Sequence, residues 1–166
     1  MNTSETCGQL RLLIINGPNL NLLGVREPDI YGRADYQALV RLCEESCAAI
    51  GAKCEVFQSN HEGAIVDRIQ QALADADGIV INPAAYTHTS VAILDALKAV
   101  QLPAVEVHIS DVSAREDFRQ ISYAGMACIK TFMGLGLDGY REAILYLKDY
   151  IEKQHKRPAG PVVYRA

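Results

Sequence analysis

The sequence LRLLIIN occupies residues 10–16 and is followed directly by Gly17 and Pro18. The run is short, almost wholly aliphatic and closed by two residues that favour turns, which is typical of a strand buried on both faces. Strands of this kind occur in parallel sheets that helices cover on both sides. The rest of the chain should therefore alternate between strands and helices.

Two hydrophobic periods do alternate along the chain. Short apolar runs predict five strands, at residues 10–16, 53–58, 78–82, 104–108 and 128–133. Helical spacing of apolar residues predicts helices at residues 36–50, 63–76, 89–100 and 138–154. The inward side chains expected of the second helix are Ile65, Ile69, Ala72, Leu73 and Ala76. This alternation most simply gives a flavodoxin-like α/β fold, a five-stranded parallel sheet in the order 2-1-3-4-5 with helices on both faces.

Length and composition fit one folded domain. The chain has 166 residues, of which 49% are hydrophobic and 22% charged. We expect a single domain at residues 10–154 between two tails, residues 1–9 and 155–166. The net charge of -4 argues against a nucleic-acid partner, and no apolar run is long enough to span a membrane. Because residues 1–10 do not resemble a signal peptide, we expect a cytoplasmic protein.

Polar side chains gather where the predicted strands end. In parallel sheets ligands bind at the carboxyl edge, at the point where the strand order reverses, here between the first and third strands. Amide, imidazole and hydroxyl side chains follow four of the strands, namely Asn16, Asn19, Asn60, His61, Asn82, His88, His108 and Ser110. Three of the four histidines thus fall at one edge, which favours a functional site there.

The connection at residues 17–33 is longer than most loops of a compact domain, which indicates a functional loop. It contains the sequence REPDIYG, with Arg26 five residues before Tyr31. A free tyrosine is ionised to only about one part in 10³ at pH 7, and a nearby positive charge increases that fraction. The alternative is that both side chains simply lie on the surface of the loop.

Other motifs are better explained by ordinary structural roles than by cofactor or metal binding. GLGLDG, at residues 134–139, matches a dinucleotide-binding pattern, but no later strand completes the required unit, so a strand-to-helix turn is expected. The five cysteines form no CxxC pair, and Cys43 and Cys47 are expected to be ordinary thiols rather than metal ligands. The histidines at the sheet edge are not spaced as local metal ligands, so no metal is expected.

Four stretches, taken together, resemble the type II 3-dehydroquinate dehydratases. They are NGPNLNLLGVREPDIYG (residues 16–32), SNHEG (59–63), INPAAYTHTS (81–90) and EVHISDVSARE with FRQISY (106–123). The resemblance covers about residues 11–150 and keeps the order and spacing of that family's motifs. It implies a lyase of the shikimate pathway, used in aromatic amino acid biosynthesis or in quinate catabolism. The reaction implied is dehydration of 3-dehydroquinate to 3-dehydroshikimate through an enolate, without metal or cofactor.

The resemblance also implies catalytic roles. Tyr31 matches the tyrosinate that accepts the C2 proton, and Arg26 matches the arginine that keeps it ionised. Asn19 matches the asparagine that helps hold the enolate oxygen through a water. His108 matches the acid that protonates the departing C1 hydroxyl, and Glu106 resembles the carboxylate that orients its ring.

Binding roles follow from the same resemblance. Asn82 and the backbone amides of Ile109 and Ser110 resemble a clamp for the substrate carboxylate, while His88 and Arg119 resemble contacts to ring hydroxyls. Arg115 matches an arginine that meets the closing loop, and Asp95 matches an aspartate that reaches a neighbouring subunit's site. The implied assembly is a homo-oligomer built from trimers, commonly a dodecamer.

Two interpretations of another class remain open at this point. One is a flavodoxin-like binding module that holds a nucleotide or flavin at residues 134–139. The other is a non-catalytic assembly protein, which predicts a stable oligomer without turnover. The presence of Asn19, Arg26, Tyr31 and His108 together counts against the second, because such a protein has no chemical need for all four.

Overall fold

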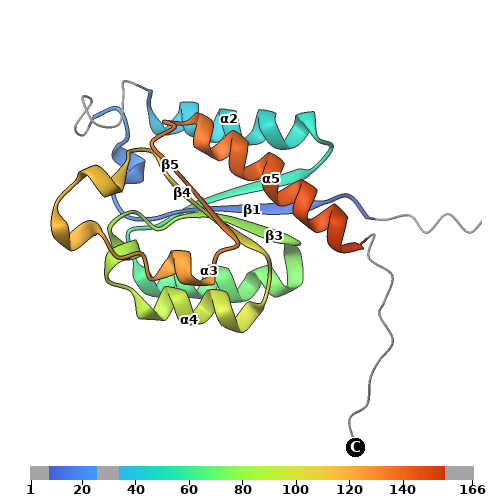
Figure 1. Cartoon of the computed structure of the whole chain (residues 1–166). Helices are drawn as coiled ribbons and strands as arrows, with labels where there is room; N and C mark the ends of the chain where they lie inside the picture. Colours follow the sequence, from blue (N-terminus) through green and yellow to red (C-terminus); the bar gives the residue numbers. More distant parts are fainter. Residues whose placement is uncertain (1–7, 26–33, 156–166) are drawn as a thin grey trace, which may run out of the picture.

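The computed structural model describes residues 8–25 and 34–155, and its centre is a parallel sheet (Figure 1). The strands are β1 (Arg11–Asn16), β2 (Lys53–Gln58), β3 (Gly78–Asn82), β4 (Ala104–His108) and β5 (Lys130–Met133). They lie in the order β2-β1-β3-β4-β5, and each neighbouring pair runs parallel. The predicted flavodoxin-like fold and strand order are confirmed.

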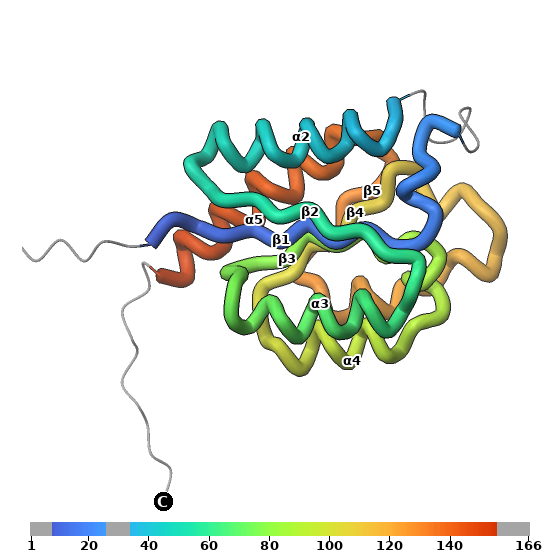
Figure 2. Tube along the Cα trace, turned by 180° about the vertical axis from the view of Figure 1, so that it is seen from behind, coloured from blue at the N-terminus to red at the C-terminus, as the bar shows by residue number. Residues whose placement is uncertain are grey.

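Helices cover both faces of the sheet. They are α2 (Tyr36–Ala49), α3 (Glu62–Asp75), α4 (Val91–Val100) and α5 (Asp138–His155). Helices α2 and α5 pack together on one face, and α3 and α4 on the other (Figure 1). Figure 2 shows that β1 begins and α5 ends at the same end of the molecule. The carboxyl ends of the strands lie at the opposite end, where the connecting loops gather.

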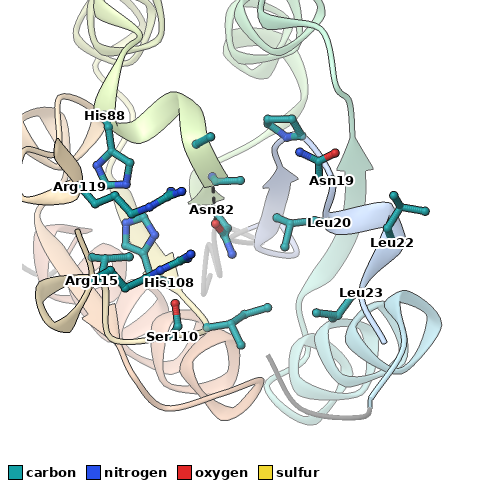
Figure 3. Close-up of a pocket in the computed structure, with 15 residues that line it drawn as sticks. Asn19, Leu20, Leu22, Leu23, Asn82, His88, His108, Ser110, Arg115 and Arg119 are labelled. Carbon is teal, nitrogen blue, oxygen red and sulfur yellow. Dashed lines mark hydrogen bonds between the residues drawn. The ribbon is translucent and has the colours of Figure 1, made fainter. Parts of the chain in front are cut away.

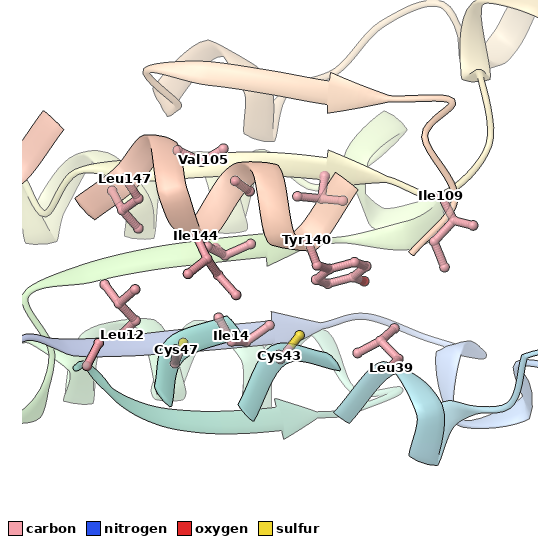
Figure 4. Close-up of a cluster of buried hydrophobic side chains, with 14 of the residues drawn as sticks. Leu12, Ile14, Leu39, Cys43, Cys47, Val105, Ile109, Tyr140, Ile144 and Leu147 are labelled. Carbon is pink, nitrogen blue, oxygen red and sulfur yellow. The ribbon is translucent and has the colours of Figure 1, made fainter. Parts of the chain in front are cut away.

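The strand β1 contributes to both hydrophobic cores. Successive side chains of a strand point to opposite faces, so Leu12 and Ile14 pack under α2 and α5 (Figure 4). Leu13 and Ile15 pack instead with α3 and α4. These four side chains are at most 2% exposed, which explains why the strand reads as one continuous apolar run.

Side-chain caps fix where two of the helices begin. Asp35 accepts a hydrogen bond from the backbone N–H of Ala38 at 2.8 Å, and Ser90 accepts one from Ile93 at 2.9 Å. The cap at Ser90 starts α4 two residues later than the predicted helix at 89–100. The preceding residues form the 3₁₀ helix η2 (Ala84–His88).

One predicted core residue is wrong. Leu73 of α3 is 64% exposed, although Ile65, Ile69, Ala72 and Ala76 are buried as expected. Those four residues form the apolar stripe of α3 and its C-cap, and Leu73 lies at the edge of the stripe that faces solvent. The opposite edge of the stripe faces the sheet. There Arg68 is buried, because its guanidinium is paired with Glu55 of β2 and with Asp75.

Within residues 8–25 and 34–155, no helix has both the length and the apolar character needed to span a membrane. The helix α5 extends through His155, which the sequence analysis assigned to the second tail. The proposed domain limits otherwise stay a prediction.

Candidate active site

The site begins where β1 and β3 end side by side. Asn16 and Asn82 are partners in the sheet register, and the N–H of Gly17 donates to the carbonyl of Asn82 at 2.8 Å. A Cβ atom on Gly17 would lie 2.3 Å from the carbonyl oxygen of Pro83. Only glycine allows the two loops to approach this closely. Because β2 and β3 flank β1, this is the point at which the strand order reverses.

A hollow of about 100 Å³ opens at this edge. Its lining includes eight of the residues that the sequence analysis selected, namely Asn19, Asn82, His88, His108, Ile109, Ser110, Arg115 and Arg119. Figure 3 shows Asn82 between two groups of side chains. Asn19 and the leucines of the first loop lie on one side, and the histidines and arginines lie on the other. The structure brings these eight residues together at one edge of the sheet, whereas their roles stay predictions.

A neutral network, formed by Asn16, Tyr140 and Asn82, lies beneath the hollow. Asn82 Nδ2 donates to the hydroxyl of Tyr140 at 2.9 Å, and that hydroxyl donates to Asn16 Oδ1 at 2.7 Å. Asn82 Oδ1 accepts from the N–H of Ala84 at 3.1 Å. Burial raises the pKa of Tyr140 well above its ordinary value, so the phenol stays neutral. The network fixes which way the amide of Asn82 faces.

The loop that leaves β3 is strained at one residue. Ala84 has a φ of 53°, in the left-handed region that a residue with a Cβ atom seldom adopts. Its N–H donates to Asn82 Oδ1, so the strained residue is tied directly to the amide of Asn82. Strain of this kind is typical of functional sites.

His108 and Glu106 form a charged contact on the other side of the hollow. Their side chains leave the same face of β4, and His108 Nε2 lies 2.9 Å from Glu106 Oε1. The ring N–H is not aligned as in an ideal hydrogen bond, so the contact is mainly electrostatic. Burial raises the pKa of Glu106, but contacts with His108, Ser122 and Thr87 outweigh burial and lower it to about 2. The carboxylate is therefore ionised at neutral pH.

His88 has one ring nitrogen engaged with the backbone. Its Nδ1 donates to the carbonyl of Ile121 at 2.7 Å, since a carbonyl oxygen can only accept. Burial and the nearby positive charges of His108 and Arg119 lower the pKa of His88, although the Ile121 carbonyl and Glu106 act in the opposite direction. A neutral ring with Nδ1 protonated leaves Nε2 as an acceptor for a hydroxyl group.

Glu116 pairs with both arginines of the site. The Nε atom of Arg119 lies 2.8 Å from Glu116 Oε2, and that of Arg115 lies 3.6 Å from the same oxygen. The side chains of Arg119 and Arg115 are only 20% and 15% exposed, so much of each is covered by the surrounding loop. Both line the hollow and give this side of it positive charge.

The backbone of Asn19 has an unusual conformation, and a side-chain hydrogen bond from the loop after β2 holds it in place. Its φ of 68° is left-handed, which asparagine tolerates better than most residues. The N–H of Asn19 donates to Asn60 Oδ1 at 2.9 Å, and the hydroxyl of Tyr86 donates to the carbonyl of Asn60 at 2.7 Å. Asn60 therefore acts as a brace between the first loop and the loop after β3.

Several selected residues lie away from the hollow or outside the description. Arg26 and Tyr31 lie outside the described residues. Asp95 is exposed on α4 and is not part of the hollow's lining. His61 precedes α3 and does not join His88 and His108 in the lining. Among residues 8–25 and 34–155, no group of three or more histidine, cysteine or acidic side chains is arranged to hold a metal ion.

The glycine-rich segment at residues 134–139 forms a turn between β5 and α5, as predicted. Gly134 and Gly136 have positive φ values of 76° and 59°. The N–H of Gly134 donates to the carbonyl of His108, and that of Gly136 donates to the carbonyl of Ile109. The turn therefore ties the end of β4 to α5.

Three polar residues of this region, Tyr140, Thr87 and Ser122, were not selected by the sequence analysis. The signal for the last two was present in the stretches THTS and ISY, where hydroxyl residues stand beside selected positions.

The fold and the site define the class of the protein. It is a doubly wound, flavodoxin-like α/β protein with a candidate site at the carboxyl edge of its sheet, formed by an imidazole and carboxylate pair, amides and arginines. Residues 10–148 match the family model described as Dehydroquinase class II. The chain belongs to the class II dehydroquinase family.

Individual relatives agree with this assignment. Over 134 residues the chain is 54% identical to a 3-dehydroquinate dehydratase of Rhodopseudomonas palustris, covering 80% of this chain and 89% of the relative. It is 55% identical over 133 residues to a catabolic 3-dehydroquinase of Aspergillus clavatus, with the same coverage of 80% and 89%. The crystal structure of a type II dehydroquinase from Butyrivibrio crossotus has a TM-score of 0.83 and 51% identity, covering 84% of this chain and 98% of that one.

Proposed function

We propose that the protein dehydrates 3-dehydroquinate to 3-dehydroshikimate. The family and its named relatives support this reaction, and the observation that carries it here is the contact between His108 and Glu106. The contact involves the imidazole of His108, the proposed proton donor, at the edge of the hollow. Amide groups on the opposite side of the hollow suit a small hydroxylated acid. The reaction is the same whether the enzyme serves biosynthesis or quinate breakdown, and the relatives' names include a catabolic enzyme.

The proposed chemistry divides into two proton transfers. The phenolate of Tyr31, kept ionised by Arg26, removes a proton from C2 beside the ketone, and the electrons move into an enolate. Asn19 holds the enolate oxygen through a water, where negative charge develops. His108 then gives its proton to the C1 hydroxyl, which leaves as water while the double bond forms between C1 and C2. Such acid catalysis typically contributes about 10² to 10⁴ in rate.

The remaining side chains of the site hold the substrate. The second N–H of Asn82 and the backbone amides of Ile109 and Ser110 bind the substrate carboxylate. His88 Nε2 accepts a hydrogen bond from a ring hydroxyl, and Arg119 donates to another. Arg115 meets the loop that carries Tyr31.

A direct assay tests this function. 3-Dehydroquinate is added, and the ultraviolet absorbance of the conjugated enone product is followed for wild type, Tyr31→Phe and His108→Ala. We expect turnover by wild type and a loss of several hundredfold or more in both variants with the circular dichroism spectrum unchanged. A correctly folded wild type without turnover refutes the proposal.

Neither a metal nor a cofactor is needed for this reaction, because the ketone itself stabilises the carbanion and the side chains supply the base and the acid. We therefore expect turnover to persist after dialysis against EDTA. A loss of activity that an added divalent cation restores would contradict this part of the proposal.

The proposed assembly is a dodecamer built from trimers, with Asp95 reaching the site of a neighbouring subunit. Asp95 is exposed and is not part of its own hollow's lining, and the chain also exposes large apolar side chains, including Phe118, Ile121 and Met126. Light scattering gives the mass of the assembly. Mixing and reassembling inactive Asp95→Ala and His108→Ala subunits should restore part of the activity, because some sites then receive both intact residues. If no activity returns, Asp95 does not act across subunits.

A further inference from the structure

The carboxylate of Glu106 is surrounded by hydroxyl groups. Its Oε1 accepts from Thr87 at 2.5 Å and from Ser122 at 2.6 Å, and its Oε2 accepts from Thr131 at 3.0 Å. Thr87 belongs to η2, Thr131 to β5 and Ser122 to the loop before the 3₁₀ helix η5 (Ala124–Ala127). Four segments distant in sequence thus meet at one carboxylate that is 1% exposed. We call Thr87, Ser122 and Thr131 the hydroxyl cage.

The backbone holds two members of the cage in place. The N–H of Gly125 donates to Ser122 Oγ at 2.9 Å, so the hydroxyl hydrogen of Ser122 remains for the carboxylate. The N–H of Tyr123 donates to the carbonyl of Thr87 at 2.8 Å, which ties the two segments together. A Cβ atom on Gly125 would lie 2.6 Å from Glu106 Oε2, so this backbone passes close to the carboxylate.

The cage determines what Glu106 presents to His108. An ionised carboxylate only accepts hydrogen bonds, and three hydroxyl donors satisfy it as an anion without neutralising it. They also fix its rotation, with Oε1 directed at His108 Nε2 at 2.9 Å. Since Nε2 is buried beside Glu106, Nδ1 is the ring nitrogen left for the ligand.

We propose that the hydroxyl cage positions the acid of the reaction, because Thr87, Ser122 and Thr131 fix the Glu106 carboxylate that in turn fixes the ring of His108. These residues are positioning residues, since none of them needs to touch the substrate. The inference rests on the proposed role of His108 as proton donor. It adds to the proposed site the three hydroxyl side chains of the cage, which contact Glu106.

Removing one hydroxyl at a time tests the cage. The variants are Thr87→Val, Ser122→Ala and Thr131→Val, with kcat and KM measured on 3-dehydroquinate in the assembled enzyme. We expect each of the first two to lower kcat about tenfold and to change KM less than about twofold, because a misdirected acid slows proton transfer without removing a substrate contact. Thr131→Val should have a smaller effect, because its bond is the longest of the three.

Two controls separate positioning from packing. Ser113→Ala is the matched control, because Ser113 lines a separate, neighbouring pocket together with Glu106 but donates to Asp111 Oδ1 instead. It should leave kcat unchanged. Thr87→Ser keeps the hydroxyl and should retain most of the activity that Thr87→Val loses. If Thr87→Ser loses as much as Thr87→Val, or if Ser113→Ala equals Ser122→Ala, the proposal is wrong.

A measurement without substrate distinguishes this inference from the function itself. Nitrogen-15 NMR of the His108 ring reports which ring nitrogen carries the proton and how mobile the ring is. We expect Ser122→Ala and Thr87→Val to shift or broaden the His108 signals, and Ser113→Ala to leave them unchanged. Unchanged His108 signals in the cage variants overturn the proposal, whereas changed signals in an enzyme without turnover would place the failure in the proposed function. Should Thr87→Val not fold, Ser122→Ala alone decides.

Discussion

The neutral network of Asn16, Tyr140 and Asn82 differs in kind from the charged contact of His108 and Glu106. Both are buried, and both lie at the carboxyl edge of the sheet. The neutral network fixes an amide whose hydrogen bonds do not change with pH. The charged contact exists only while Glu106 is ionised, so its strength depends on pH and on every donor around it. One site therefore combines a neutral, hydrogen-bonded amide with a contact that requires an ionised carboxylate.

Removing the charge should have the largest effect on stability. Glu106→Ala leaves three hydroxyls and an imidazole without their acceptor, and breaking a buried pair in this way costs about 3–5 kcal/mol. Urea denaturation at pH 7 measures the loss. Glu152→Ala is the control, because its ion pair with Lys148 lies on the surface, where solvent screens it and its contribution to stability is small. Equal losses of unfolding free energy in the two variants would show that the buried Glu106 stabilises the protein no more than a surface ion pair does.

Acid should weaken the charged contact selectively. The pKa of Glu106 is lowered from 4.5 to about 2, so its contribution to stability is complete above pH 4.5 and is lost as the pH falls towards 2. The shift corresponds to about 3 kcal/mol. Denaturation at several pH values should show that wild type loses about this much more than Glu106→Gln across the window. Parallel curves for the two proteins would contradict the assignment.

The neutral network should lose less, and equally at all moderate pH values. Tyr140→Phe removes the hydroxyl that joins Asn82 to Asn16, which costs about 1–3 kcal/mol. Because burial keeps the phenol neutral, the loss should be the same at pH 5 and pH 8. The freed amide of Asn82 should raise KM more than it lowers kcat. A loss that changes between the two pH values would show that the network is coupled to the charged contact.

The smallest loss of stability is expected from removing a single hydrogen bond that lies outside both the neutral network and the charged contact. Ser90→Ala removes the cap of α4, which should cost about 1 kcal/mol in thermal denaturation without changing kcat. If kcat falls as well, the helix start contributes to the geometry of the site, and the two networks are less separate than described.

The sequence predicts the sheet better than it predicts the site's interior. The apolar run of β1 specifies a strand covered on both faces, because a run this short that ends in glycine and proline favours a strand over a buried helix. Leu73 was misplaced because an apolar residue at the edge of a helical stripe has no fixed direction until its neighbours are known.

The residues of the site divide in the same way, into those that the sequence predicts and those that it does not. Asn19, Asn82, His88 and His108 were found because the topology alone brings strand ends together. The hydroxyl cage was not, because serine and threonine are common in loops and only the folded chain shows that Thr87, Ser122 and Thr131 meet at one carboxylate. The orientation of Tyr140 was hidden for a similar reason, since one ring serves both the core and the network.

The shared strand β1 has a consequence for the cooperativity of unfolding. Leu12 and Ile14 belong to one core and Leu13 and Ile15 to the other, so neither layer of helices can separate without exposing the strand on which the other rests. The two layers should therefore melt in one transition, and the amide hydrogens of β1 should exchange with solvent only when the whole domain opens. The first loop of the site begins at the end of this strand, so the site is anchored on the part of the molecule that should open last.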